Sequence, residues 1–269
     1  MGNASEMSAT REGDSVLAQI LAIVNQKGGV GKSTTAVNLA ATLGEEGKTV
    51  LLVDLDPQGN ATSGFGLDKN GREICVYNAL LGDTPMADIV QSVTEPNVHV
   101  VPATIQLAGA EIELVSAISR ETRLKNILQP LLADYDYVVI DCPPSLGLLT
   151  VNALTAADGV LIPVQCEYYA LEGLTKLLES VRLVKTHLNP SLEVFGVLMT
   201  MFDARTRLSM QVVDEVKKFF GPKVFDTIIP RSVRLSEAPS YGQPITTFDS
   251  AGRGAEAYRS LAKEVVARV

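Results

Sequence analysis

The sequence has little of what a metal cluster or a membrane span requires. Its three cysteines, Cys75, Cys142 and Cys166, are widely spaced and form no Cys-x-x-Cys pair, so we expect buried, reduced thiols. The longest apolar stretches, such as residues 159–164, are far shorter than the roughly 20 residues that cross a bilayer. These absences argue against an iron–sulfur electron carrier and against a membrane protein. The apolar stretches are better interpreted as buried strands.

An excess of basic charge is also absent. The chain has 23 Lys and Arg residues against 31 Asp and Glu residues, which gives a formal net charge of −8. This balance argues against a protein coated in positive charge. Any contact with nucleic acid must therefore come from a local basic patch.

The first residues have none of the features of a signal peptide. Residues 1–16 are polar and of mixed charge, without the basic start and the apolar run that a signal peptide has. We predict that they form a disordered tail on a cytoplasmic protein. No internal repeat, low-complexity linker or change in composition follows, so we predict a single domain over residues 17–269.

Short β-branched runs alternate along the chain with longer segments of helical period. This alternation predicts an α/β fold with a doubly wound, mainly parallel sheet and helices on both faces. The predicted strands span residues 20–25, 49–55, 98–101, 137–141, 159–164, 194–200 and 224–229. Helices are predicted over residues 31–46, 169–188 and 254–269, the first of them ended by Gly47. The apolar stripe of the last helix carries too much charge beside it for a membrane anchor, so we assign it to the core.

A glycine-rich loop between the first strand and the first helix has the residues of a phosphate-binding site. The segment reads Lys27-Gly28-Gly29-Val30-Gly31-Lys32-Ser33-Thr34. Its glycines allow backbone N–H groups to point inward, and the following helix adds its positive end. We expect Lys32 to reach the β- and γ-phosphates of ATP and Ser33 to coordinate Mg²⁺. The order strand, loop, GK[ST] and helix is the one that this chemistry needs.

The loop departs from the usual motif at its start. The glycine expected five residues before Gly31 is replaced by Gln26, and Lys27 follows it. The variant resembles the deviant Walker A motif, which implies that Lys27 crosses a dimer interface to the partner's nucleotide. Lys27 could otherwise be an ordinary solvated loop charge.

Carboxylates follow two further strands at their carboxyl ends. Asp54 and Asp56 follow the second strand, and Asp141 ends the strand at residues 137–141. The carboxyl ends of parallel strands meet at the edge where the P-loop lies. Asp141 therefore has the setting of a Walker B aspartate that holds Mg²⁺ through water. A strand-terminal aspartate can also be a simple turn former.

The chain as a whole resembles the ParA/Soj-type partition ATPases, from residue 20 to its end. Three strings outside the nucleotide motifs carry the resemblance: PATIQLAGAE at 102–111, PVQCEYYALEG at 163–173 and IPRSVRLSEAPS at 229–240. They are specific to this subgroup, whereas the P-loop is shared with many relatives. Two departures stand out. Ser232 replaces an expected asparagine, and the N-terminal tail is longer than in compact members but too short for a helix-turn-helix domain.

The resemblance implies an ATP cycle. Two subunits would sandwich two nucleotides, the ATP-bound homodimer would bind DNA of the nucleoid without sequence preference, and a ParB/Spo0J-type partner would stimulate hydrolysis. Asp56 matches the residue that orients the attacking water. Pro230 and Arg231 match the loop over the adenine, and Arg205 and Arg234 match positions of DNA contacts. Both arginines could instead be ordinary surface charges.

Several related functions share this fold. A MinD-like membrane-positioning ATPase is disfavoured because the C-terminus lacks a basic amphipathic targeting helix. A tyrosine-kinase relative should have a tyrosine-rich tail, and a synthetase needs an organic-substrate pocket that no motif indicates. A ParA-like ATPase that positions another cargo, such as a chemotaxis cluster or microcompartment, remains the main alternative to chromosome or plasmid segregation.

Overall fold

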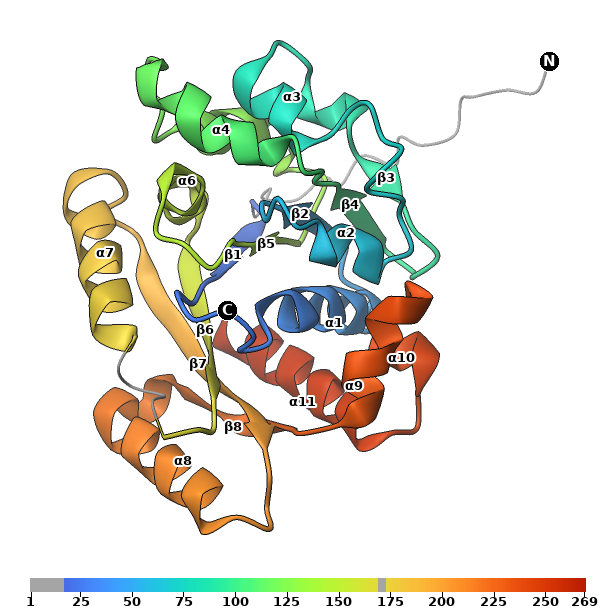
Figure 1. Ribbon diagram of the computed structural model, residues 1–269, viewed down its shortest axis with the longest axis vertical. Coiled ribbons are helices and arrows are strands. Elements are labelled where there is room, and N and C mark those ends of the chain that lie inside the picture. Colours follow the sequence, from blue (N-terminus) through green and yellow to red (C-terminus); the bar gives the residue numbers. More distant parts are fainter. Residues whose placement is uncertain (1–16, 169–172) are drawn as a thin grey trace.

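The computed structural model describes residues 17–168 and 173–269 (Figure 1). The predicted tail at 1–16 and the first residues of the helix predicted at 169–188 lie outside this part. The strands are β1 (Gln19–Ile23), β2 (Val50–Asp54), β3 (Gln91–Ser92), β4 (Val98–Val101), β5 (Tyr137–Asp141), β6 (Gly159–Gln165), β7 (Glu193–Phe202) and β8 (Val224–Pro230). The helices are α1 (Lys32–Glu45), α2 (Asn60–Gly64), α3 (Val76–Leu81), α4 (Leu107–Glu113), α5 (Arg123–Leu128), α6 (Leu148–Ala156), α7 (Leu174–His187), α8 (Arg207–Phe220), α9 (Val233–Glu237), α10 (Ile245–Phe248) and α11 (Arg253–Arg268).

The strands form one mainly parallel sheet in the order β3-β4-β2-β5-β1-β6-β7-β8. Only the β3–β4 pairing is antiparallel among the strand pairs of the described chain. The predicted doubly wound sheet and its seven strands are confirmed. The short edge strand β3 was not predicted, because two residues are too few to show an alternating pattern.

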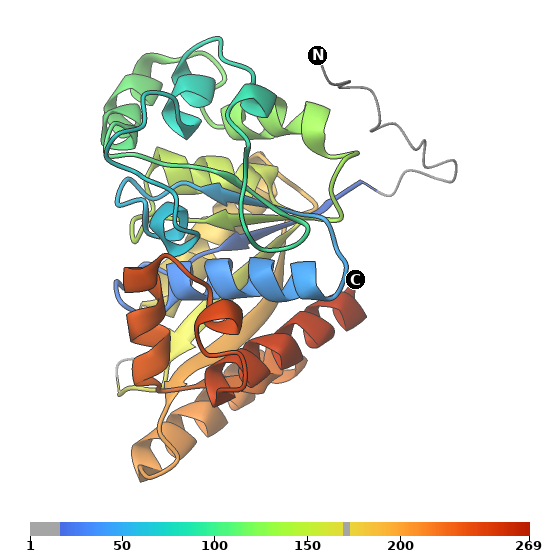
Figure 2. The ribbon, with the colours of Figure 1, turned by 90° about the vertical axis from the view of Figure 1, so that its right-hand side faces the viewer.

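Helices pack on both faces of the sheet, and alternate residues of each strand face opposite layers. In β1, Leu21 and Ile23 join a core formed with α1, α2, α10 and α11, whereas Ala22 joins the core formed with α3 to α8. Figure 2 shows α1 and α11 side by side on one face. Because both faces are covered, the central strands are apolar along their whole length.

The helix ends largely follow the predicted signals. Gly47 adopts the left-handed conformation (φ 79°) just after α1, and Lys48 N–H donates to the Leu43 carbonyl at 3.1 Å. In α11, the predicted stripe is buried at Tyr258 and Leu261. Its last member, Val269, is instead 65% exposed, because the helix ends at Arg268 and the chain leaves the core there.

Within residues 17–168 and 173–269, no helix is both long and apolar enough to cross a bilayer.

Candidate nucleotide-binding site

Three adjacent strands bring the predicted site together at the carboxyl edge of the sheet. β5 lies between β1 and β2, and Asp141 is level with Ile23 on one side and with Asp54 on the other. The P-loop leaves the sheet after β1. The register of three strands therefore places the loop and the strand-terminal carboxylates next to one another.

The P-loop turns into α1 through two glycines with left-handed backbone. Gly29 has φ 73° and Gly31 has φ 90°, values that other L-residues rarely adopt. Two side chains fix the loop from outside. The Asn25 carboxamide oxygen accepts from Lys27 N–H at 2.9 Å, and the Thr200 hydroxyl donates to the Val30 carbonyl at 2.9 Å. The loop is thus held open at the helix start, where its backbone can receive an anion.

A cavity of about 450 Å³ lies over this loop. From the predicted site, its lining includes Gly28, Gly29, Gly31, Lys32, Ser33, Thr34 and Asp56. The rest of the lining is Val37, Asn38, Gln58, Asn60, Ser63, Gly64, Pro144, Met201, Ala238, Pro239 and Gln243. The predicted residues Lys27, Val30, Asp141, Pro230 and Arg231 are not part of the lining.

Lys32 is buried at the base of the P-loop, with 7% of its surface exposed. Its ammonium donates to the Lys27 carbonyl at 3.2 Å. Burial lowers the pKa of Lys32, and the nearby Asp141 and Asp56 carboxylates partly offset this effect. The ammonium therefore lies between the loop that would hold phosphates and the acidic end of the sheet.

Asp141 is a buried carboxylate whose hydrogen-bonding capacity is not filled by the described residues. Neither of its oxygens has a partner of hydrogen-bonding geometry among the described residues. Burial and the neighbouring Asp54 raise its pKa well above the ordinary value, while the nearby Ser33 hydroxyl and Lys32 ammonium act in the opposite direction. An orphaned buried carboxylate is costly, and such a group needs a partner that supplies positive charge.

Mg²⁺ fits this position. It prefers oxygen ligands, takes one or two from the protein and the rest from water and phosphates. Ser33 and Asp141 supply such oxygens beside the cavity. Among the described residues, no group of three or more His, Cys, Asp or Glu side chains is placed to hold a metal ion.

The two aspartates after β2 have different environments. The Asp54 carboxylate accepts from Thr62 N–H at 2.8 Å and from the Thr62 hydroxyl at 2.7 Å, and burial raises its pKa to about 6. The Asp56 carboxylate lines the cavity and accepts from Gln58 N–H at 2.9 Å. Asp54 thus holds α2 in place, whereas Asp56 lies at the cavity.

Lys27 and Arg231 lie together at the rim. The Lys27 ammonium is 3.5 Å from one oxygen of Glu167, and the Arg231 guanidinium is 3.4 Å from the other. Pro230 ends β8 immediately before Arg231. The predicted role of Pro230 and Arg231 over the adenine stays a prediction.

The two arginines predicted to contact DNA are exposed, and each has an acidic neighbour. The Arg205 guanidinium binds Asp203 through two hydrogen bonds of 2.9 and 2.7 Å. Arg234 pairs with Glu237 at 3.2 Å and stacks over Phe248. Neither arginine lines the cavity.

Several residues that support the site were not predicted from the sequence. Glu111 accepts from the N–H groups of Leu148 and Leu149, and so fixes the start of α6 after the loop that carries Pro144. Met201 lines the cavity in a left-handed conformation (φ 53°), which is unusual away from glycine and common at functional sites. No local pattern marks either residue, since their contacts come from distant segments.

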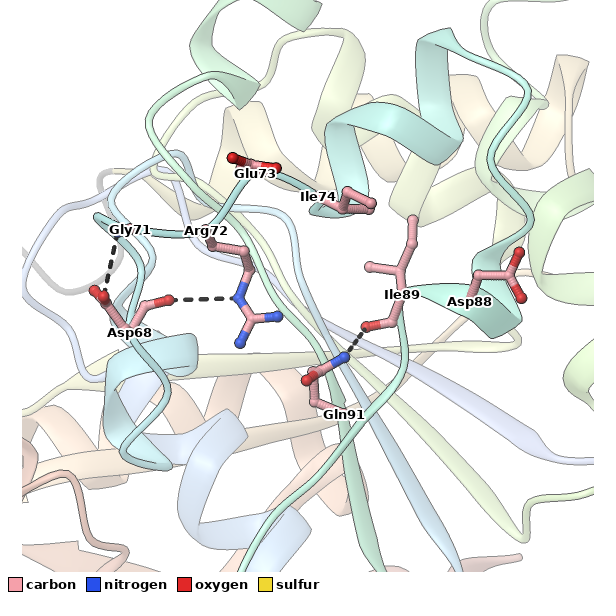
Figure 3. Close-up of a pocket in the computed structure, with 8 residues that line it drawn as sticks. All are labelled: Asp68, Gly71, Arg72, Glu73, Ile74, Asp88, Ile89 and Gln91. Carbon is pink, nitrogen blue, oxygen red and sulfur yellow. Dashed lines mark hydrogen bonds between the residues drawn. The ribbon is translucent and has the colours of Figure 1, made fainter. Parts of the chain in front are cut away.

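A second cavity of about 460 Å³ shares no lining residue with the first (Figure 3). It is open and lies between the loop at residues 68–74 and the segment at 88–91. Arg72, one of its lining residues, donates to the Asp68 carbonyl. This cavity has no glycine-rich helix start and no buried cation, so the P-loop cavity is the better candidate for the site of nucleotide chemistry.

Comparison with known proteins identifies the family. The family model described as an AAA domain matches residues 18–194. The chain is 63% identical to the sporulation initiation inhibitor protein Soj of Bacillus subtilis over 93% of this chain and 99% of that protein. It is 53% identical to the chromosome partitioning protein ParA of Myxococcus xanthus, over 95% of this chain and 90% of that protein.

The chain belongs to the Soj/ParA family of partition ATPases.

One solved structure of similar fold contains bound ligands. Cobyrinic acid a,c-diamide synthase from Mycobacterium smegmatis, solved with a bound ATP analogue and magnesium, has a TM-score of 0.83 and 39% identity, over 93% of this chain and 95% of that one. A protein of similar fold therefore binds an ATP analogue and magnesium.

Proposed function

We propose that this Soj/ParA-family chain binds ATP and Mg²⁺ at the P-loop cavity and uses hydrolysis to drive DNA partition. One observation carries the proposal: Asp141 is buried, no described residue gives it a hydrogen bond of full geometry, and the Ser33 hydroxyl and Lys32 ammonium lie nearby at a loop whose backbone can receive phosphates. Lys32 would neutralise the β- and γ-phosphates, Ser33 and Asp141 would hold Mg²⁺, and Asp56 would orient the attacking water.

The proposed active form is an ATP-bound homodimer. Lys27 lies outside the lining of its own cavity and is half-exposed at the rim, so its ammonium can extend to a nucleotide held by a second subunit. A lysine from the partner would stabilise charge that develops on the transferred phosphate, which couples hydrolysis to dimerisation.

The proposed dimer binds DNA without sequence preference, through Arg205 and Arg234. Both guanidinium groups are exposed and can reach phosphates. Contacts with the backbone of DNA confer affinity but no sequence preference. A dimer doubles these contacts on one body, so ATP would control DNA affinity. A ParB-type DNA-bound partner would then stimulate hydrolysis and release the dimer.

DNA binding by the purified protein with ATP, with ADP and without nucleotide tests the proposal. We expect binding with ATP only, and Lys27→Ala should bind ATP but remain monomeric in sedimentation with a slowly hydrolysed analogue. Strong binding without nucleotide would contradict the proposed switch. If Lys27→Ala forms a dimer as stable as the wild-type dimer, Lys27 is an ordinary surface charge.

A further inference from the structure

Glu167 connects the P-loop rim to two other segments of the chain. It follows β6, and its carboxylate contacts Lys27 of the P-loop and Arg231 after β8. The Gln165 side-chain amide also donates to it, at 2.6 Å. One carboxylate thus receives two cations and an amide.

Lys27 and Arg231 together form an anion-binding site, and the Glu167 carboxylate of the same chain fills it. Two cationic side chains from separate segments converge on one point, which favours a negative charge there. In this structure, Glu167 supplies that charge. While this ion pair is intact, the Lys27 ammonium stays on its own subunit. It must leave Glu167 before it can extend toward a nucleotide in another subunit.

We propose that Glu167 is a positioning residue that competes with the partner's triphosphate for Lys27. The inference rests on the proposed ATP-bound dimer, whose formation Glu167 would oppose. While ATP is scarce, Glu167 holds Lys27 on its own subunit. The more highly charged triphosphate of a facing subunit displaces it, so Glu167 raises the ATP concentration at which dimers form.

The size of the effect follows from solvent exposure. The Lys27 and Glu167 side chains are 40% and 46% exposed, so their pairing is weak. Exposed pairs of this kind change an equilibrium by about 1.5- to 5-fold. Two such ion pairs, one in each subunit, must open for each dimer. The dimer dissociation constant should therefore change by the square of the effect of one pair, about 2- to 25-fold.

Glu167→Gln tests the proposal, because it keeps the shape of the side chain and removes its charge. Sedimentation across a titration with a slowly hydrolysed ATP analogue should show a dimer dissociation constant about 2- to 25-fold lower than in wild type. The difference should shrink at high salt, since exposed charges are screened. Glu179→Gln, which removes an exposed α7 carboxylate that makes no ion pair with any described residue, is the matched control and should equal wild type.

A second measurement separates competition for Lys27 from an effect on nucleotide binding itself. In the monomeric Lys27→Ala background, adding Glu167→Gln should leave the affinity for the analogue unchanged. A changed affinity there, or a Glu167→Gln dimer no tighter than the wild-type dimer, would overturn the role of Glu167 while leaving the proposed function intact. A wild-type chain that stays monomeric at saturating analogue would overturn both.

Discussion

At the scale of single residues, the site depends on charges placed where water is scarce. Lys32 is buried and bound to a backbone carbonyl, and Asp141 is buried without a donor. Burying each charge is costly, and phosphates and a cation bound as proposed would offset that cost. Buried charges of this kind are typical of positions where a fold sacrifices stability for function.

Lys32→Ala should abolish measurable nucleotide binding. The change removes the buried ammonium that the loop directs at the phosphates, a loss of at least about 100-fold in affinity. Calorimetric titration with ATP and Mg²⁺ measures it. Lys263→Ala, an exposed lysine of α11, is the control and should bind normally. Normal affinity in Lys32→Ala would contradict the assignment of the P-loop.

Asp56→Ala should separate binding from hydrolysis. The carboxylate lines the cavity but acts on water rather than on the phosphates, so ATP affinity should change by less than about 2-fold while turnover falls by about 10²- to 10⁴-fold. Phosphate release with and without DNA measures turnover, and Asp214→Ala on the exposed side of α8 serves as control. Wild-type turnover in Asp56→Ala would remove this residue from the mechanism.

At the scale of elements, neighbouring helices are joined by side chains that satisfy helix ends. Glu111 of α4 accepts from the first N–H groups of α6, as a capping residue would, but from a distant part of the chain. A Cβ atom at Gly147 would lie 2.5 Å from the Glu111 oxygens, so a larger residue there would displace the end of the Glu111 side chain from the start of α6. The same contact fixes the loop that carries Pro144 into the cavity.

Glu111→Ala should therefore destabilise the fold by about 1–2 kcal/mol, which is the usual cost of losing a helix cap. For a domain of this size, that loss corresponds to a decrease in Tm of about 2–8 °C. Thermal unfolding followed by circular dichroism measures it. Glu113→Ala on the same helix removes only an exposed contact with Tyr77 and should shift Tm by much less. Equal shifts in both variants would show that the cap contributes little.

At the scale of the whole molecule, a net charge of −8 opposes contact with DNA. Screening limits this repulsion, because the Debye length is about 8 Å at physiological salt and distant carboxylates are hidden from a bound phosphate. The nearby carboxylates matter more. Asp203 pairs with Arg205 through two hydrogen bonds, so in the proposed DNA contact this local pairing would matter more than the net charge.

Arg205→Ala and Asp203→Asn should change DNA binding in opposite directions. Losing Arg205 removes one phosphate contact from each subunit, which should weaken binding to all sequences and flatten the log–log salt slope by about 2 per dimer. Asp203→Asn frees the guanidinium and should strengthen binding. Affinity measured over a salt series with ATP checks both. Unchanged slopes in both variants would place the DNA surface elsewhere.

The sequence by itself determined the parts that depend on neighbours in the chain. Apolar runs predicted seven strands, Gly47 predicted the end of α1, and the glycines with Lys32 and Ser33 predicted the phosphate loop, because backbone preference and side-chain period are local properties. Local order also predicted Asp141 at a strand end. Its complete burial without a donor could not be predicted, since burial depends on which strands and helices lie around it.

Only the tertiary structure decided which distant side chains meet. Thr62 binds Asp54, Thr200 fixes the Val30 carbonyl, and Glu167 receives Lys27 and Arg231. These partners lie on different strands and loops, and strand order in the sheet sets the distance between them. That order results from packing two helical layers against one sheet, a cooperative outcome of the whole chain that no local window of sequence contains.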